Sequence, residues 1–187
     1  MMIEICERVL FYRHKQLDAW IGGDKSITPD FAARPPIIIN QPRYHFAEMF
    51  VLRHYYETEQ WKGFASYALG QQYPRSERRA DGRLKAAQII PKDRLQRLQA
   101  LRSSPEVARG GRGEPDLFLY KNTGQFKFVE VKKGSDCLRE PQLICIAQIL
   151  DVLQCEVDIV YVQEEQQKYT PKTYRFDIVH HTGERLV

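Results

Sequence analysis

Acidic and basic side chains at strand spacing between residues 115 and 132 could bind a metal ion and act on a phosphate. Asp116 follows a proline, and Glu130 and Lys132 lie 14 and 16 positions further along the chain. Because alternate residues of a strand share a face, Glu130 and Lys132 point the same way. Apolar residues occupy both faces of this strand, so two charges at its end are costly unless a partner compensates them. A divalent cation is the usual partner for a carboxylate in such a place.

The chemistry that fits these residue types is metal-dependent hydrolysis of a phosphodiester bond. Mg²⁺ or Mn²⁺ prefers oxygen ligands, and Asp116, Glu130 and the backbone carbonyl of Val131 would supply them. The metal would activate a water and neutralise charge on the phosphate, while the Lys132 ammonium would position that water. Taken singly, Pro-Asp is a common turn and Glu-x-Lys a common exposed ion pair. Their joint occurrence beside two apolar strands favours the metal site.

The sequence around these residues resembles a nuclease family. Residues 110–162 are similar to the core of the virus-type replication-repair nuclease (VRR-NUC) domain, a branch of the PD-(D/E)xK superfamily that also forms the catalytic end of the Fanconi-associated nuclease. The matching elements are Gly113, Pro115-Asp116-Leu117, the strand Phe126 to Lys132, Asp136, Leu138 and Gln142. The resemblance implies an α/β protein of restriction-endonuclease-like fold, with a central mixed β-sheet flanked by helices. It also implies Mg²⁺- or Mn²⁺-dependent cleavage of DNA by Asp116, Glu130 and Lys132.

Two further residues take catalytic roles through the same resemblance. Glu48 interrupts an apolar stripe at helical spacing within residues 44–64, so its carboxylate either reaches solvent or serves a site. The family places an acidic residue there, which implies that Glu48 is catalytic and contacts the metal, directly or through water. Gln142 opens a helix and would face the Glu-x-Lys strand; its alternative is an ordinary polar residue at a helix start.

The elements that must position these residues are predicted from hydrophobic periodicity and turn residues. Helices are expected over residues 1–26, 43–59, 91–102 and 139–153, with a loop over 27–42 and a turn or further helix over 61–69. Strands are expected over residues 116–120, 126–132, 156–162 and 173–180. The first two strands form an antiparallel hairpin that brings Asp116 near Glu130, and the third returns parallel to the second after a helical crossover.

Charge is concentrated just before the Pro-Asp motif. Residues 75–112 hold eleven Lys or Arg and four acidic residues, a net +7 against +4 for the whole chain. We expect this segment to contact the DNA backbone, with Arg94, Arg97, Arg109 and Arg112 as the candidate residues. The alternative is a solvated helix face. The segment belongs to a basic helical insertion at about 70–112 within a nuclease domain over 43–187, preceded by an N-terminal helical extension and loop over 1–42.

Composition excludes several other classes. The 187 residues contain no apolar stretch of 18 or more, so no membrane-spanning helix is expected, and the charged N-terminus lacks the apolar core of a signal peptide. The four cysteines form no CxxC pair, which argues against a zinc site or a disulfide framework. The five histidines are interpreted as structural. We therefore expect a cytoplasmic protein with reduced thiols.

The substrate is the least determined part of the prediction. Relatives of this family act on branched or flapped DNA in repair and recombination, and standalone members resemble Holliday-junction resolvases that work as homodimers. Here 68 residues separate Glu48 from Asp116, which leaves room for an inserted basic element and leaves the oligomeric state open. Two alternatives remain: a non-catalytic DNA-binding or regulatory module of the same fold, and a nuclease that acts on RNA or single strands.

Overall fold

The central feature of the fold is a mixed five-stranded sheet. The computed structural model describes residues 1–32, 35, 38–69, 77–103 and 113–186. The strand order across the sheet is β2 (Arg8–Tyr12), β6 (Glu156–Glu164), β5 (Phe126–Lys133), β4 (Leu117–Tyr120) and β3 (Lys62–Phe64). Strands β2, β6 and β5 are parallel, whereas β4 and β3 continue the sheet antiparallel. The long, fully covered strand β5 lies in the middle of the sheet and carries the Glu-x-Lys motif.

The hairpin of β4 and β5 forms as predicted. Its turn contains Gly124 with φ +85°, a left-handed conformation in which a glycine carries no Cβ penalty. Leu117 pairs with Val129 in the antiparallel register, so the preceding residue, Asp116, comes opposite Glu130. The predicted proximity of these two carboxylates is therefore a consequence of strand register.

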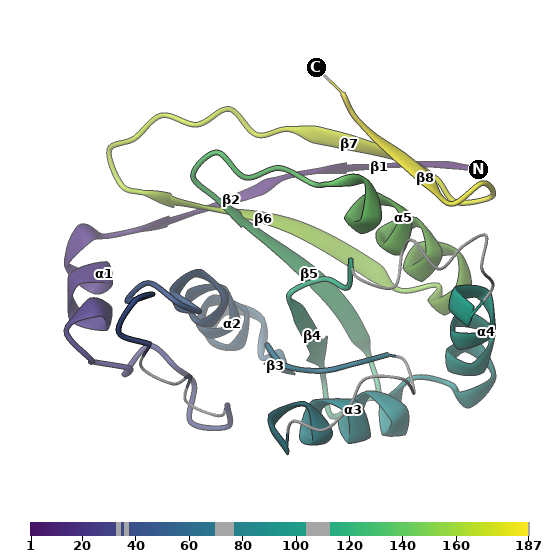
Figure 1. The fold of residues 1–187 in the computed structure, drawn as a ribbon, viewed down its shortest axis with the longest axis horizontal. Helices are drawn as coiled ribbons and strands as arrows, with labels where there is room; N and C mark the ends of the chain where they lie inside the picture. The colour runs from purple at the N-terminus through teal and green to yellow at the C-terminus, as the bar shows by residue number, and fades with distance from the viewer. Residues whose placement is uncertain (33–34, 36–37, 70–76, 104–112, 187) are drawn as a thin grey trace.

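Helices cover both faces of the sheet. Helix α2 (Phe46–Glu59) lies on one face, where Val129 and Val131 of β5 join its core. The other face carries α5 (Glu140–Gln148), which continues into a π-helical turn, η2 (Ile149–Leu153). Figure 1 shows α2 and α5 on opposite sides of β5. The crossover from β5 through α5 to the parallel strand β6 confirms the predicted βαβ unit, and the whole architecture is the expected restriction-endonuclease-like α/β fold.

The predicted N-terminal helix over residues 1–26 is wrong. The chain begins with two strands, β1 (Met2–Cys6) and β2, followed by the short helix α1 (His14–Ile21). Ile3 and Ile5 face inward and alternate with exposed residues, which is a strand period, but Ile5 and Val9 also fit a helical spacing. Strand β1 joins a second, antiparallel sheet of order β1-β7-β8, with β7 at Thr173–Asp177 and β8 at Thr182–Leu186. Pairing with β7, a distant part of the chain, therefore decides that residues 2–6 form a strand and not a helix.

Three other element predictions need correction. Within residues 61–69, for which the sequence predicts a turn or a further helix, Lys62–Phe64 form the short strand β3, because they pair with β4 at the sheet edge. The predicted last strand ends at residue 177, so His180 and His181 lie in the turn before β8. The basic segment holds the predicted helix as α4 (Lys92–Ser103), but it also forms an additional helix, α3 (Glu77–Ile89).

Candidate active site

Three of the predicted residues form one buried cluster between β5 and the start of α5. Lys132 Nζ lies 2.7 Å from Glu130 Oε1, and Gln142 Nε2 donates a 2.5 Å hydrogen bond to the same oxygen. Lys132 Nζ also donates to Gln142 Oε1 at 3.2 Å. Glu130 and Lys132 are 0% and 3% exposed, so this ion pair is withdrawn from solvent. The structure therefore confirms that Gln142 faces the Glu-x-Lys strand, as predicted.

Asp116 joins the cluster from the neighbouring strand. Its Oδ2 accepts a 2.8 Å hydrogen bond from the backbone amide of Val131, directly between Glu130 and Lys132 in sequence. This contact fixes the carboxylate at the end of β4, beside the end of β5. Asp116, Glu130 and the Val131 backbone, the three groups expected to bind metal, are therefore adjacent.

Close packing of Gly113 holds the start of α5 in place. A Cβ at this position would lie 2.2 Å from the carbonyl oxygen of Pro141 and 2.7 Å from the amide nitrogen of Gln142. Only glycine permits that approach. Gln142 is further held because its Oε1 accepts a 3.1 Å bond from the backbone amide of Arg139. Gly113, one of the elements that match the family, therefore serves as a contact between the Pro-Asp segment and α5.

A second buried network anchors the residues just before Asp116. Arg102 of α4 donates from Nη1 to Glu114 Oε1 at 3.0 Å, and its Nη2 lies 2.8 Å from Cys145 Sγ on α5. The Tyr67 hydroxyl donates a 2.6 Å bond to the carbonyl of Pro115. These contacts tie the Pro-Asp turn to two helices. Arg102 is one of the eleven basic residues of 75–112, and nothing local in the sequence indicates its pairing with Glu114.

Glu48 approaches from the opposite face, on the first turn of α2. Its Oε1 receives a 3.2 Å hydrogen bond from His45 Nδ1, whereas its buried Oε2 has no hydrogen-bond partner among the described residues. Burial acts to raise the pKa of Glu48, but the bond from His45 and the charge of Lys133 outweigh it, so the pKa is lowered. Glu48 is therefore an ionised carboxylate, and its charge is felt by Asp116.

Crowding of carboxylates perturbs the other two acids in the opposite direction. Burial raises the pKa of Asp116 to about 6, against the stabilising effect of the Val131 amide, and the charge of Glu48 adds to this. Burial raises the pKa of Glu130 to about 8, and the charge of Asp116 adds to it although Lys132 opposes both. Ionising both acids is therefore costly at this position, and a bound cation would relieve that cost.

The donor atoms fit a hard divalent cation. Glu130 Oε2 is buried without a hydrogen-bond partner among the described residues, as is Glu48 Oε2. Within the same described part of the chain, no three His, Cys, Asp or Glu side chains group together as a complete metal cage. Mg²⁺ does not require one, because it is usually held by one or two carboxylates and keeps several waters. The residues present are therefore compatible with Mg²⁺ or Mn²⁺ and not with a cage of the structural zinc type.

The predicted DNA-binding residues differ in their surroundings. Arg94 is half-buried and donates from Nη1 to the carbonyl of Leu153 at 2.9 Å, so it closes the end of η2. Arg97 is exposed on α4. Arg109 and Arg112 lie outside the described residues. Of the four candidates, Arg97 is the described one whose charge faces solvent.

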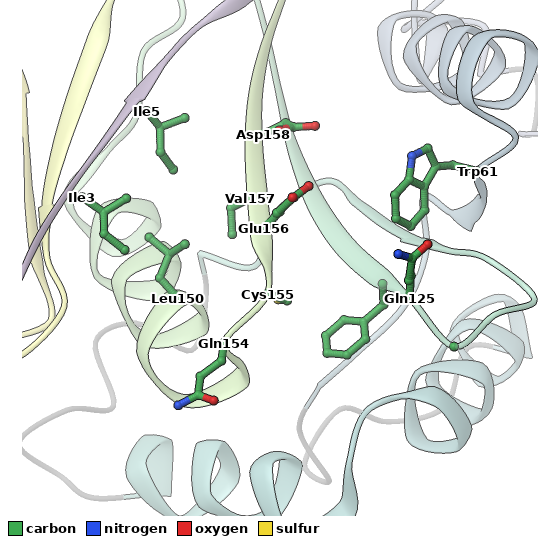
Figure 2. A pocket seen from close by; sticks show the side chains of 12 residues that line it. Ile3, Ile5, Trp61, Gln125, Leu150, Gln154, Cys155, Glu156, Val157 and Asp158 are labelled. Carbon is green, nitrogen blue, oxygen red and sulfur yellow. The ribbon is translucent and has the colours of Figure 1, made fainter.

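A cavity of about 660 Å³ lies at the other end of β5 and β6, away from these residues. Ile3 and Leu150 line one side of it, while Trp61 and Gln125 line the other (Figure 2). None of the predicted site residues that the structure describes contributes to its wall. The candidate active site is therefore the cluster of charges rather than this cavity.

The fold and the paired carboxylates beside a lysine are those of the PD-(D/E)xK nuclease class. The model of the VRR-NUC domain family matches residues 56–164, more than half of the chain, so the protein belongs to that family and is a nuclease. No curated protein matches the chain. No helix in the described part of the chain is long and apolar enough to cross a membrane. Asp116, Glu130, Lys132 and Gln142 lie within the matched residues, whereas Glu48 precedes them.

Proposed function

We propose that the protein hydrolyses phosphodiester bonds of DNA in a reaction that depends on Mg²⁺ or Mn²⁺. The observation that carries the proposal is Glu130, a fully buried carboxylate opposite Asp116, whose pKa is raised to about 8 and whose Oε2 has no hydrogen-bond partner among the described residues. A fold gains no stability from two crowded buried acids. A protein that only binds DNA would also be hindered by such carboxylates near phosphates.

Asp116, Glu130 and the Val131 carbonyl would hold the metal, with Glu48 contributing through water. When bound, the cation supplies a Lewis acid that activates water and offsets charge on the phosphate. The protein's own part is to keep these oxygens fixed. The Val131 amide orients Asp116, and Gln142 orients Glu130 from the start of α5.

Lys132 would act on the attacking water and the phosphate. Its Nζ lies between Glu130 and Gln142, which fix it in a site closed to bulk water. A charge held in such a site stabilises developing negative charge without reorganisation at the moment of reaction. Gln142 is then the residue that links the metal-binding carboxylate to the lysine.

The substrate part of the proposal is DNA, held by exposed cations such as Arg97, with Arg109 and Arg112 as further candidates. A preference for branched, flapped or four-way-junction DNA, and a homodimeric enzyme, follow from the family resemblance. Gel filtration with light scattering measures the oligomeric state. A panel of duplex, flap, junction, single-stranded and RNA substrates measures the preference.

Labelled substrates incubated with Mg²⁺, Mn²⁺ or EDTA test the proposed reaction. We expect cleavage that needs the metal. The cleavage rate should fall at least about 10³-fold in Glu130→Gln, because the metal loses a carboxylate ligand and the water that it would activate is lost with it. Glu156→Gln, an exposed carboxylate on β6, is the matched control and should cleave like the wild type. Cleavage in EDTA, or full activity of Glu130→Gln, would contradict the proposal. DNA binding without cleavage of any substrate would favour a non-catalytic module.

A further inference from the structure

His45 stands at the start of α2 in a conformation that needs explanation. It is the N-cap residue, with φ 58° and ψ 12°, in the left-handed region that side chains other than glycine seldom adopt. Histidine is among the residue types enriched there, but the conformation persists only where surrounding contacts impose it. Such strain is concentrated at functional sites.

Contacts with α1 and between neighbouring residues hold the chain around His45. Trp20 of α1 donates from Nε1 to the carbonyl of Tyr44 at 3.2 Å. The Tyr44 ring lies against the His45 ring, with 3.9 Å between centroids, and the Phe46 amide bonds the carbonyl of Arg43 at 3.1 Å. The turn is therefore held on both sides of His45.

The side chain of His45 does not do what an N-cap side chain usually does. N-cap residues accept a hydrogen bond from a free amide of the first turn, and a glutamate at the third helical position reaches back to the cap. Glu48 occupies that third position, yet the His45 side chain makes no cap hydrogen bond. Its Nδ1 instead donates to Glu48 Oε1 at 3.2 Å. The His45 side chain therefore bonds the Glu48 side chain and not an amide of the first turn.

This contact leaves one oxygen of Glu48 available. Oε1 is occupied by His45, and Oε2 is buried with no hydrogen-bond partner among the described residues. Phe46 and Ala47, beside this pair on α2, pack in one core cluster with Leu117 and Val131, the neighbours of Asp116 and Glu130 in sequence, and the charges of Glu48 and His45 act on Asp116. A glutamate on the first turn of a helix has several rotamers, and the histidine selects one of them.

We propose that His45 is a positioning residue that fixes the Glu48 carboxylate so that its free oxygen serves the divalent cation. The inference rests on the proposed function, since it assigns a supporting group to the same site. It concerns residues before the stretch matched by the family model, which begins at residue 56. The turn at 41–46, held by Trp20, is then part of the site's framework.

A double-mutant cycle on Mn²⁺ binding tests this role without relying on activity. Mn²⁺ is titrated into the full chain and the free ion is followed by electron paramagnetic resonance. We expect His45→Ala to weaken binding about tenfold, as losses of groups that orient ligands do. His45→Asn should recover most of the affinity, because its amide N–H can replace Nδ1–H and asparagine tolerates the left-handed conformation. In a Glu48→Ala background, His45→Ala should change nothing further.

Cleavage kinetics supply the second readout. A residue that acts through Glu48 should lower kcat in His45→Ala and leave KM for DNA unchanged, whereas a DNA contact would raise KM. Thermal melting shows whether each variant folds. If His45→Ala does not fold, His45→Asn and Glu48→Ala are compared with the wild type instead.

Three outcomes would overturn the inference: equal effects of His45→Ala with and without Glu48, no recovery in a folded His45→Asn, or a change confined to KM. A wild-type protein that binds Mn²⁺ but cleaves nothing would overturn the proposed hydrolysis and leave the Mn²⁺ comparison valid. Absence of Mn²⁺ binding in the wild type would overturn both.

Discussion

Strand β5 carries a buried lysine at each end, and the two ends differ in how their charges are compensated. Lys127 is 5% exposed and Lys132 is 3% exposed. Lys127 Nζ lies 2.7 Å from Asp158 Oδ2 and 3.8 Å from Glu59 Oε2. It also lies over the rings of Tyr55 and Trp61, at 4.6 and 5.0 Å from their centroids. Both lysines are thus paired, and burial of an ion pair does not by itself distinguish them.

The carboxylates show the difference. Asp158 and Glu59 have side chains that are 30% and 32% exposed, and they receive further hydrogen bonds from Tyr55, Arg8 and Trp61. The Glu130 side chain is 1% exposed, and its second oxygen has no partner among the described residues. The Lys127 end is a satisfied structural cluster, whereas the Lys132 end has a carboxylate in excess. An uncompensated acid, rather than a buried lysine, is the mark of the candidate site.

Replacing each lysine by methionine should separate the two ends most strongly. Lys132→Met is expected to lower cleavage by about 10²–10³-fold, because it removes a preorganised charge from the reacting phosphate. Lys127→Met should leave cleavage unchanged but lower the free energy of unfolding by about 2 kcal/mol, less than for a fully buried pair because its carboxylates reach solvent. Kinetics and chemical denaturation of both variants check this. The comparison breaks if Lys127→Met abolishes cleavage in a folded protein.

Stability of the metal-free protein should depend on pH through the Lys132 end. Asp116 and Glu130 have pKa values raised by burial to about 6 and about 8, so these two acids hold more protons in the folded than in the unfolded chain between about pH 4 and about pH 8.5. Stability should therefore fall as the pH rises from about 5 to about 8.5, and Mn²⁺ affinity should rise over the same range as these protons leave. Glu48, His45, Lys132 and Asp136 are the other charges acting on this pair.

Melting temperatures with and without Mn²⁺ across this pH range are the measurement. Glu130→Gln should remove most of the pH dependence because it removes the acid with the largest shift. Asp158→Asn, at the Lys127 end, should retain that dependence. A metal-free protein whose stability rises steadily from pH 5 to 8.5 would show that the carboxylates of the site are not in excess.

The smallest expected effect concerns the basic helix α4. Arg97→Ala should weaken DNA binding several-fold and reduce the salt slope by about one charge, because an exposed phosphate contact is lost. Arg94→Ala is the matched control: it loses its bond to Leu153, so it should lower stability more than affinity. Binding isotherms at several salt concentrations separate them. Equal salt slopes for Arg97→Ala and the wild type would mean that this face of α4 is only solvated.

The local parts of the fold were predictable from the sequence. The β4–β5 hairpin, α5 and β6 carry clear period and turn signals, and the antiparallel register alone brought Asp116 opposite Glu130. Strand β1 could not be predicted in the same way, because Ile5 and Val9 fit both periods and the decision comes from pairing with β7. Long-range pairing is invisible in a single local window.

The same limit applies to the site. Asp116, Glu130 and Lys132 were indicated by residue type and spacing, and Gln142 by the family pattern. His45 was interpreted as structural, because the role proposed for it depends on a left-handed turn held by Trp20. One signal was available, since a histidine three residues before a helical glutamate is a poor cap. The pairing of Arg102 with Glu114 was not predicted, because the two residues lie 12 positions apart and no local pattern links them.

The most direct test of the excess carboxylate is calorimetric titration of Mn²⁺ into the wild type, Glu130→Gln, Asp116→Asn and Asp158→Asn at pH 8. The account predicts binding to the wild type and to Asp158→Asn, and loss of binding in Glu130→Gln and Asp116→Asn while all four proteins remain folded. Unchanged Mn²⁺ binding in both single variants, Asp116→Asn and Glu130→Gln, would contradict it.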